Sequence, residues 1–297
     1  MGSIAHAGDD PFVVHRRLLF TVAYELLGSA ADAEDVLQES WIRWSAVDAS
    51  EIREPRAYLV RIVTRQALNH LRTVTRRREE YVGEWLPEPL LTSPDVADDV
   101  ELAENLSIAM LTVLETLGPA ERAVFVLREV FDMPYDEIAD AVDKSPAAVR
   151  QIAHRAKSHV TARHPRVRVV RSEFEEVVGR LVAALNTGDL QGLMDVLAPD
   201  VVSVADGGGK ARGAAQRPIV GADRVARYVI GGMAKAKGAL AAVMTWVNGE
   251  PGIRMELDGQ LLGVVSLAIE DGKVTRIFSI ANPDKLGRLE VEAAVSR

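Results

Sequence analysis

The segment from Pro146 to Arg163 carries polar and basic side chains at helical spacing, several of them types that hydrogen-bond to DNA. The polar face and its flanks comprise Ala147, Arg150, Gln151, His154, Arg155, Lys157 and Ser158. The opposite face is apolar and comprises Val149, Ile152, Ala153, Ala156 and Val160. A helix of this kind can pack on a small core with one side while its other side enters a major groove.

The residues before this helix have the spacing of a helix-turn-helix. A short amphipathic pattern, YDEIADAV, precedes a turn at Asp143 and an N-cap at Ser145. Ala139, Asp143 and Val149 stand where the motif needs a small residue, a residue that tolerates positive φ and a β-branched core residue. A basic helix face alone is usually a solvated surface. Together with the turn spacing, it predicts binding to duplex DNA.

A second basic helix is predicted from Pro55 to about Arg78. Its polar stripe comprises Tyr58, Arg61, Arg65, Asn69, Arg72 and Arg76, and its apolar side comprises Leu59, Val60, Val63, Ala67 and Leu71. Guanidinium groups bind phosphates, and an aromatic ring can stack on an unpaired base. The stripe therefore predicts binding to a DNA strand that has been separated from its partner.

A third surface lies on a helix predicted from Asp32 to Trp44. One side of this helix is apolar and comprises Ala33, Val36, Leu37, Trp41 and Trp44. The other side comprises Asp35, Gln38, Glu39 and Ile42, which follow one another at helical spacing. An exposed Ile within an acidic face favours a protein docking site, although such a face taken alone is more often simply solvated.

Composition limits the kinds of protein that could carry these surfaces. The chain has 297 residues, 48% of them hydrophobic, which allows two or three domains with their own cores. It has no cysteine, which excludes disulfides, thiolate metal sites and cysteine nucleophiles. There is no apolar run near the ~20 residues needed to cross a bilayer, and the N-terminus lacks a signal-peptide pattern. We expect a soluble cytoplasmic protein without metal or cofactor.

The net charge of −8 argues against nucleic acid only until it is divided by segment. Residues 53–78 hold eight basic residues and one acidic residue, and residues 144–163 hold five basic residues and none acidic. Between them, residues 79–104 hold nine acidic residues and none basic. Local patches set the field that a polyanion meets, so these two segments can bind DNA within an acidic chain.

The pattern along the chain predicts several domains. Helices are expected over 12–78 and over 100–164, separated by an acidic, proline-containing linker at 79–99. Residues 170–286 alternate helical and strand patterns and end in a meander with tight turns at Asp258-Gly259 and Asp271-Gly272, which predicts an α+β domain. Residues 287–297 are a tail.

Five strings occur in the same order as in one bacterial family. They are DAEDVLQE (32–39), PRAYL (55–59), LGPAERAVFVLRE (117–129), YDEIA (135–139) and RQIAHRA (150–156). Over residues 12–163 the chain resembles the extracytoplasmic-function sigma factors. The resemblance implies a helical sigma-2 domain that docks on the clamp helices of core RNA polymerase and opens the minus-ten element. It also implies a sigma-4 domain whose helix-turn-helix reads the minus-35 element of promoter DNA.

Three further strings are similar to those of the subgroup with a fused SnoaL-like C-terminal domain: WLPEP (85–89), DGGGK (206–210) and NPDKL (282–286). In that subgroup the cone-shaped domain is thought to replace a separate anti-sigma factor. The resemblance implies regulatory contacts at Trp85, Pro87, Glu88, Asp206, Gly208, Lys210, Asn282, Asp284 and Lys285. Trp85 is the expected apolar anchor, and Lys210 and Lys285 are expected to pair with Glu88 or nearby acids. The glycine loop could hold an anion or be a plain flexible loop.

Two alternatives remain open for the C-terminal domain. SnoaL-like cones include enzymes, and a pocket near Tyr228, Met233 and Trp246 is conceivable, but these residues are expected in the core, and no trustworthy acid and base pair accompanies them. We therefore expect no catalysis. The other alternative is a one-component helix-turn-helix repressor whose cone binds a small ligand. Such a repressor needs neither the acidic face around Asp35 nor a second DNA-binding helix.

Overall fold

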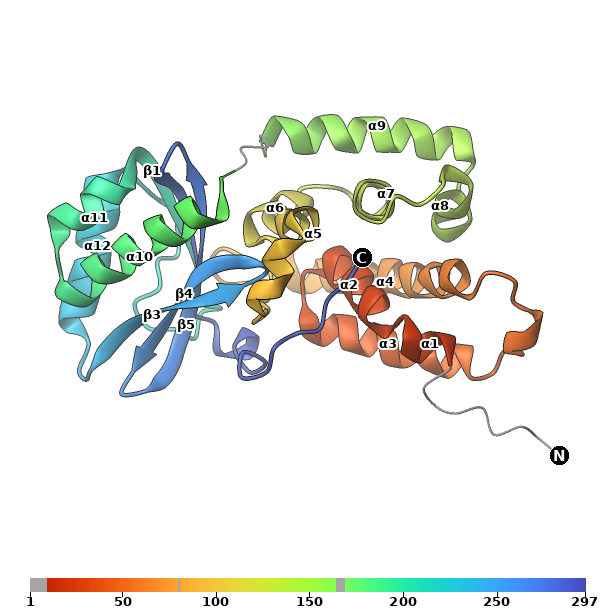
Figure 1. Cartoon of the computed structure of the whole chain (residues 1–297), viewed down its shortest axis with the longest axis horizontal. Helices are drawn as coiled ribbons and strands as arrows, with labels where there is room; N and C mark the ends of the chain where they lie inside the picture. The colour runs from red at the N-terminus through yellow and green to blue at the C-terminus, as the bar shows by residue number, and fades with distance from the viewer. Residues whose placement is uncertain (1–9, 80, 164–168) are drawn as a thin grey trace. The chain divides into compact units, whose positions relative to one another are not determined.

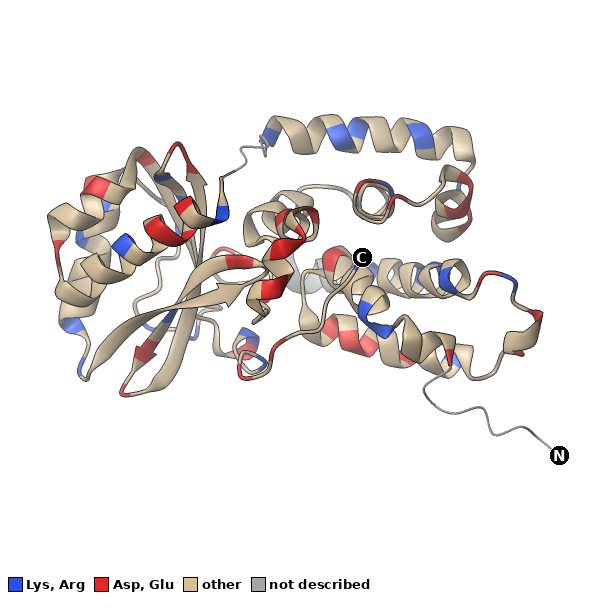
Figure 2. Cartoon of the chain, viewed as in Figure 1, with Lys and Arg blue, Asp and Glu red and all other residues tan. Residues whose placement is uncertain are grey.

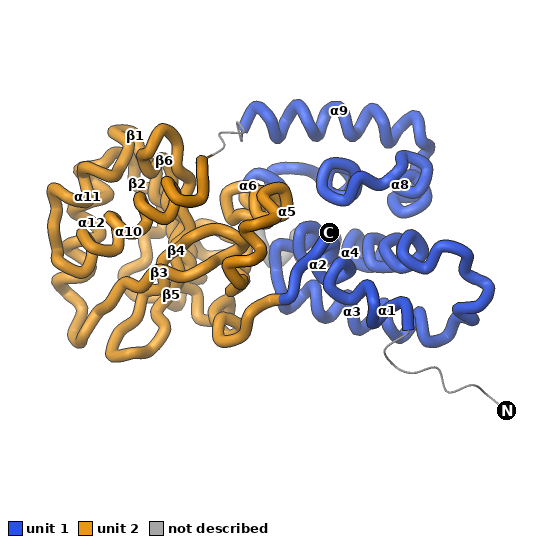
Figure 3. The backbone as a smooth tube through the Cα atoms, viewed as in Figure 1, with its two compact units in different colours: residues 1–77, 113–164, 294–297 blue, residues 78–112, 165–293 orange. Residues whose placement is uncertain are grey.

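The structure is a computed structural model that describes residues 10–79, 81–163 and 169–297, with the side chains of residues 74–79 outside the described part. Two compact units are each built from separate stretches of the chain (Figure 3). Unit 1 comprises residues 1–77, 113–164 and 294–297, and unit 2 comprises residues 78–112 and 165–293. The linker predicted at 79–99 therefore folds in the same unit as the C-terminal domain.

The first half of unit 1 is a helical bundle. Its helices are α1 (Pro11–Val14), α2 (Arg16–Leu27), α3 (Ala30–Trp44), η1 (Ala49–Glu51) and α4 (Pro55–Glu79). Gly28 ends α2 in the left-handed conformation, and the Ser29 hydroxyl caps α3 by accepting from the amide of Asp32. That cap starts α3 two residues before the predicted position. The helix predicted over 12–27 is divided at His15 into α1 and α2.

The second half of unit 1 contains α7 (Pro119–Phe125), the π-helical η3 (Val126–Val130), α8 (Tyr135–Val142) and α9 (Pro146–Arg163). The helix α6 (Ile108–Leu114) runs from unit 2 into unit 1. The predicted bounds of α8 are confirmed. None of the helices within the described ranges is long and apolar enough to cross a membrane.

Unit 2 is an α+β fold with helices on one face of a six-stranded sheet (Figure 1). Its helices are η2 (Pro94–Asp98), α5 (Val100–Leu106), α10 (Arg171–Thr187), α11 (Leu190–Val196), α12 (Ala222–Lys235) and η4 (Pro283–Lys285). Its strands are β1 (Leu197–Asp206), β2 (Ile219–Val220), β3 (Leu240–Val247), β4 (Glu250–Leu257), β5 (Gln260–Glu270) and β6 (Lys273–Ile280). The order is β2-β1-β6-β5-β4-β3, with only β1 and β6 parallel.

Two-residue turns connect the strands of the predicted meander. Asp258-Gly259 and Asp271-Gly272 both have positive φ at each residue, as hairpin turns that match the strand twist require. Asn248-Gly249 forms a third turn of this kind between β3 and β4. The meander prediction is confirmed, and the short β2 is an additional strand that the sequence pattern did not predict.

The two faces of the sheet have different coverings. One face packs against α10, α11 and α12 through a core that includes Phe174, Val178 and Ile253. The other face packs against Leu86 and Leu91 of the linker and Ile108 of α6, with Phe278 in the same cluster. Apolar residues on both faces of the sheet are thereby removed from water, and the linker contributes to this second core.

Candidate nucleic-acid interface and linker site

The helix-turn-helix has the local geometry that its sequence predicts. Asp143 adopts the left-handed conformation with φ 54°, and the hydroxyl of Ser145 accepts from the amide of Ala148 at the start of α9. Ala139 and Val149 are both buried where α8 and α9 meet. All seven predicted minus-35 residues, Ala147, Arg150, Gln151, His154, Arg155, Lys157 and Ser158, are exposed. Figure 2 shows the basic residues along α9 without acidic ones between them.

Two of these seven side chains already have partners within the chain. Lys157 makes an ion pair with Glu129 of η3 at 2.7 Å. The hydroxyl of Ser158 donates to the carbonyl of His154, one turn earlier on α9. Both contacts are exposed, so DNA can compete for these groups at small cost.

The polar stripe of α4 is only partly free. Arg61 lies over the ring of Tyr58 at 4.9 Å, and the same ring lies 6.0 Å from the ring of Trp44. Arg65 donates to the backbone carbonyl of Asp140 in α8 at 2.6 Å. Asn69 and Arg72 are exposed and hydrogen-bonded to each other. The side chain of Arg76 lies outside the described residues.

The acidic face of α3 is exposed as expected. Asp35, Gln38, Glu39 and Ile42 all lie on the surface, and Ile42 is 62% exposed. Gln66 of α4, itself buried, donates to the carboxylate of Glu39 at 2.9 Å and fixes its orientation. Trp41 departs from the prediction: it is 39% exposed and packs edge-on against Phe12 instead of lying in the core.

A buried ion pair attaches the linker to the C-terminal domain. Lys285 and Asp206 are 2.7 Å apart, and the Asp206 side chain is 0% exposed. Asp206 also accepts from the amide of Leu86 at 2.9 Å and from the hydroxyl of Tyr81, while Lys285 donates to the carbonyl of Leu86. Burial and the bond to Asp206 raise the pKa of Tyr81. We call Tyr81, Trp85, Leu86, Asp206 and Lys285 the linker site.

Leu86, and not Trp85, is the deepest apolar residue of the linker site. Leu86 is 1% exposed and lies in the core of the second sheet face, whereas Trp85 is partly exposed. The ammonium of Lys285 lies 3.2 Å from the centre of the Trp85 ring, a cation–π contact. Pro87 and Glu88 are buried beside them. The expected anchor is thus shared between a buried Leu and a Trp that covers the lysine.

Asn248 makes a second attachment of the linker, which sequence reasoning missed. Its side chain accepts from the amide of Leu90 at 2.8 Å and donates to the carbonyl of Leu106 at 2.8 Å. Next to it, the amide of Gly249 donates to the hydroxyl of Thr92, and Leu91 makes a β-bridge with Val247. The Asn-Gly turn was the available signal, but a turn predicts a hairpin and gives no partner for its side chain.

The glycine loop after β1 is held by residues of the chain itself. The amide of Gly208 donates to Asp206 at 3.1 Å, and Lys210 makes an ion pair with Asp284 at 2.5 Å. A Cβ at position 208 would overlap the side-chain amide of Asn282, so glycine is required there. Asp284 and Asp206 are therefore partners of the two lysines, acids of the C-terminal domain that sequence reasoning did not name as such. The lysine and an amide of this loop are engaged, which disfavours anion binding.

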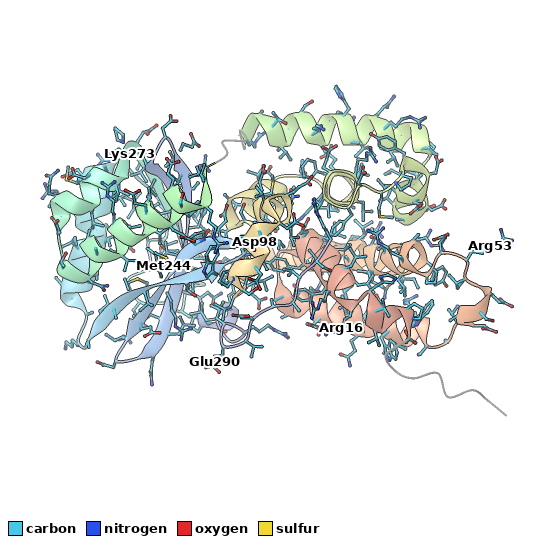
Figure 4. The ribbon with its side chains drawn as sticks, in the orientation of Figure 1. Arg16, Arg53, Asp98, Met244, Lys273 and Glu290 are labelled. Carbon is cyan, nitrogen blue, oxygen red and sulfur yellow. The ribbon has the colours of Figure 1, made fainter. Side chains whose placement is uncertain are left out.

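The residues considered for a pocket in the cone lie on different parts of the sheet. Tyr228 and Met233 lie on α12, which packs on β1 and α11, and the Tyr228 hydroxyl donates to the carbonyl of Gly213. Trp246 lies on β3 at the opposite edge and contacts Arg171 at 4.6 Å. Arg171 also pairs with Asp98, labelled in Figure 4. Within the described residues, no group of His, Asp and Glu could hold a metal ion.

Comparison with known proteins relates these surfaces to a function. Residues 12–77 match the family model of sigma-70 region 2, and residues 107–160 match that of sigma-70 region 4. The ECF RNA polymerase sigma factor SigJ of Mycobacterium tuberculosis is 40% identical over 287 residues, covering 92% of this chain and 91% of SigJ. The probable ECF sigma factor SigI of the same species is 32% identical and covers 94% of both chains.

A solved structure extends the likeness to the C-terminal domain. The crystal structure of M. tuberculosis SigJ aligns with a TM-score of 0.73 at 37% identity, covering 92% of this chain and 96% of that one. The expected fold class, helical sigma domains followed by an α+β SnoaL-like domain, is confirmed. The chain belongs to the extracytoplasmic-function RNA polymerase sigma factors, alternative sigma factors that direct transcription initiation.

Proposed function

We propose that three surfaces of the sigma half divide the work of initiation. The face of α3 around Asp35 and Ile42 docks on the clamp helices of core polymerase. The stripe of α4 binds the opened minus-ten strand, and the exposed face of α9 reads the minus-35 duplex. The observation that carries the assignment is that all seven predicted residues of α9 are exposed behind a helix-turn-helix of the expected geometry.

Exchanging residues on α4 and α9 should have different effects on promoter DNA. Arg150→Ala or Gln151→Ala should weaken binding to a minus-35 duplex by ~1–3 kcal/mol, because each removes a base-edge contact. Arg61→Ala and Arg65→Ala should leave duplex affinity unchanged and slow strand opening, measured by permanganate reactivity of the bubble.

Arg163→Ala is the matched control for these variants. Arg163 is exposed, ends the same helix and carries the same charge, but it lies off the predicted face. Its change should cost less duplex affinity than Arg150→Ala. If Arg65→Ala lost duplex affinity while bubble reactivity stayed normal, the roles of α4 and α9 would be reversed.

We also propose that the C-terminal domain regulates the sigma half in cis. The support is that the linker at 79–99, which connects the sigma-2 and sigma-4 domains in sequence, supplies Leu86 and Leu91 to a core of unit 2. A change in that core therefore changes the chain that joins the two DNA-binding domains. On this proposal no separate anti-sigma factor is needed, the domain performs no catalysis, and the chain acts in the cytoplasm. Any small ligand of the cone would act through the same linker.

Trp85→Ala should change run-off transcription more than Lys210→Ala does. Trp85 covers the buried ammonium of Lys285, whereas the Lys210 and Asp284 side chains are 57% and 62% exposed, and exposed ion pairs contribute only ~0–1 kcal/mol. Both changes should loosen the chain in small-angle scattering. If deletion of residues 166–297 left transcription unaltered, the domain would be a passenger.

A one-component repressor is not favoured, because the sequence relatives are sigma factors over nearly their whole length. Binding to core polymerase separates the two functions experimentally, since a repressor of this kind does not bind it.

A further inference from the structure

A buried ionic cluster in unit 1 joins the sigma-2 region to the sigma-4 region. Arg122 of α7 is 2% exposed, and its Nε donates to the carbonyl of Glu25 in α2 at 2.8 Å. Its Nη1 pairs with Glu115 at 2.7 Å. A Cβ added at Gly28 would meet Glu115 at 2.7 Å, so α2 ends in close contact with this cluster.

The cluster is incompletely satisfied, which is unusual for buried charges. Within the described residues, neither carboxylate oxygen of Glu25 has a hydrogen-bond partner, nor does Nη2 of Arg122. Burial raises the pKa of Glu25 to about 8 and lowers the pKa of Arg122 to about 10, each partly offset by the other group. A buried ion pair of this quality adds little net stability, but it specifies one arrangement of the two helices, which is the property of a switch.

A second contact between the same two regions occupies a predicted DNA-binding residue. Arg65 of α4 donates to the carbonyl of Asp140 in α8, 75 residues away in sequence. The chain end adds a third contact in this unit, where the amide of Ser296 donates to the hydroxyl of Thr21 in α2, one turn before Glu25. Thr21 is fully buried.

This arrangement conflicts with promoter binding as proposed above. The minus-ten and minus-35 elements lie about 25 base pairs apart, or about 80 Å at 3.4 Å per base pair. The α4 stripe and the helix-turn-helix cannot reach elements at that separation while Arg65 is hydrogen-bonded to α8. The two regions must therefore separate before both can bind.

We infer that unit 1 is a closed, autoinhibited form of the sigma half, in which Arg122 is the latch between α2 and α7 and Asp140 masks Arg65. The inference rests on the proposed roles of α4 and α9. Core polymerase, which engages the separated form, opens the latch by binding that form more tightly.

Spin labels can measure the opening directly, because the chain has no native cysteine. Cysteines at Arg43 of α3 and Thr161 of α9, both exposed, place one label on each region. In the free chain, double electron–electron resonance should give one short distance, which core polymerase lengthens by tens of ångströms. Arg122→Met should populate the long distance without polymerase and raise affinity for core polymerase by about tenfold, through the larger open fraction.

Two further variants keep the test decisive. Arg128→Met removes the same charge from η3, where Arg128 pairs with Asp132, and should change neither quantity. Glu115→Gln weakens the latch without altering Arg122 and should shift the distances in the same direction, so it carries the test if Arg122→Met does not fold. Identical distance distributions in the free wild-type chain, Glu115→Gln and any folded Arg122→Met would overturn the inference. A shift in distances without a gain in polymerase affinity would keep the latch and count against the proposed docking of α3.

Discussion

The double variant Asp35→Lys and Glu39→Lys is expected to lose binding to core RNA polymerase by at least about a hundredfold, ~3 kcal/mol. Both carboxylates are exposed on α3 beside Ile42, opposite the buried Val36 and Trp44. Reversing two charges at the centre of a docking face places like charges against the partner, which costs several kcal/mol. The helix itself should remain folded, because neither side chain contributes to its core. Affinity is measured by competition or by fluorescence anisotropy with labelled chain.

The matched control places lysines at Glu51 and Glu54, two exposed acids before α4 that are outside the docking face. This control changes the net charge by the same amount. It should retain binding to within a few-fold. If the α3 variant bound core polymerase as well as the control, the docking assignment would be wrong.

Lys285→Ala is expected to destabilise unit 2 by ~3–5 kcal/mol. It leaves the Asp206 carboxylate, which is 0% exposed, without its counter-charge in the interior. It also removes the bond to the Leu86 carbonyl and the cation under the Trp85 ring. The loss is measured by urea denaturation followed by tryptophan fluorescence, because Trp85 lies at the site.

Lys210→Ala is the control, since it breaks an exposed pair and should cost at most ~1 kcal/mol. Limited proteolysis should cut the linker between residues 81 and 92 faster in Lys285→Ala than in Lys210→Ala. Equal stability losses in the two variants would contradict the linker site as an attachment.

Local signals predicted the DNA-binding half well. The turn at Asp143, the cap at Ser145 and the bounds of α8 depend on residues within one or two helical turns, and each agrees with the structure. The same holds for the Asp-Gly hairpin turns of the meander. In these elements the backbone preferences of single residues decide the conformation, so the sequence order is sufficient.

Contacts between distant residues were not predictable in this way. Leu86 is buried by a sheet face and bonded to an aspartate 120 residues away, so composition favoured the larger Trp85 as anchor. The engagement of Arg65 by Asp140 and of Glu25 by Arg122 depends on how separate helices pack. Helical periodicity gives the face on which a residue lies, but it does not give the partner of that face.

Run-off transcription of fragmented genomic DNA by core polymerase, with the 5′ ends of the transcripts sequenced, tests the central claim on every promoter that the genome contains. With the wild-type chain, transcripts should begin at a limited set of sites that share elements near minus ten and minus 35. Addition of Arg150→Ala should redistribute those starts, and the Asp35→Lys, Glu39→Lys chain should abolish them. Starts that are the same with the wild-type chain as with core polymerase alone would contradict the account.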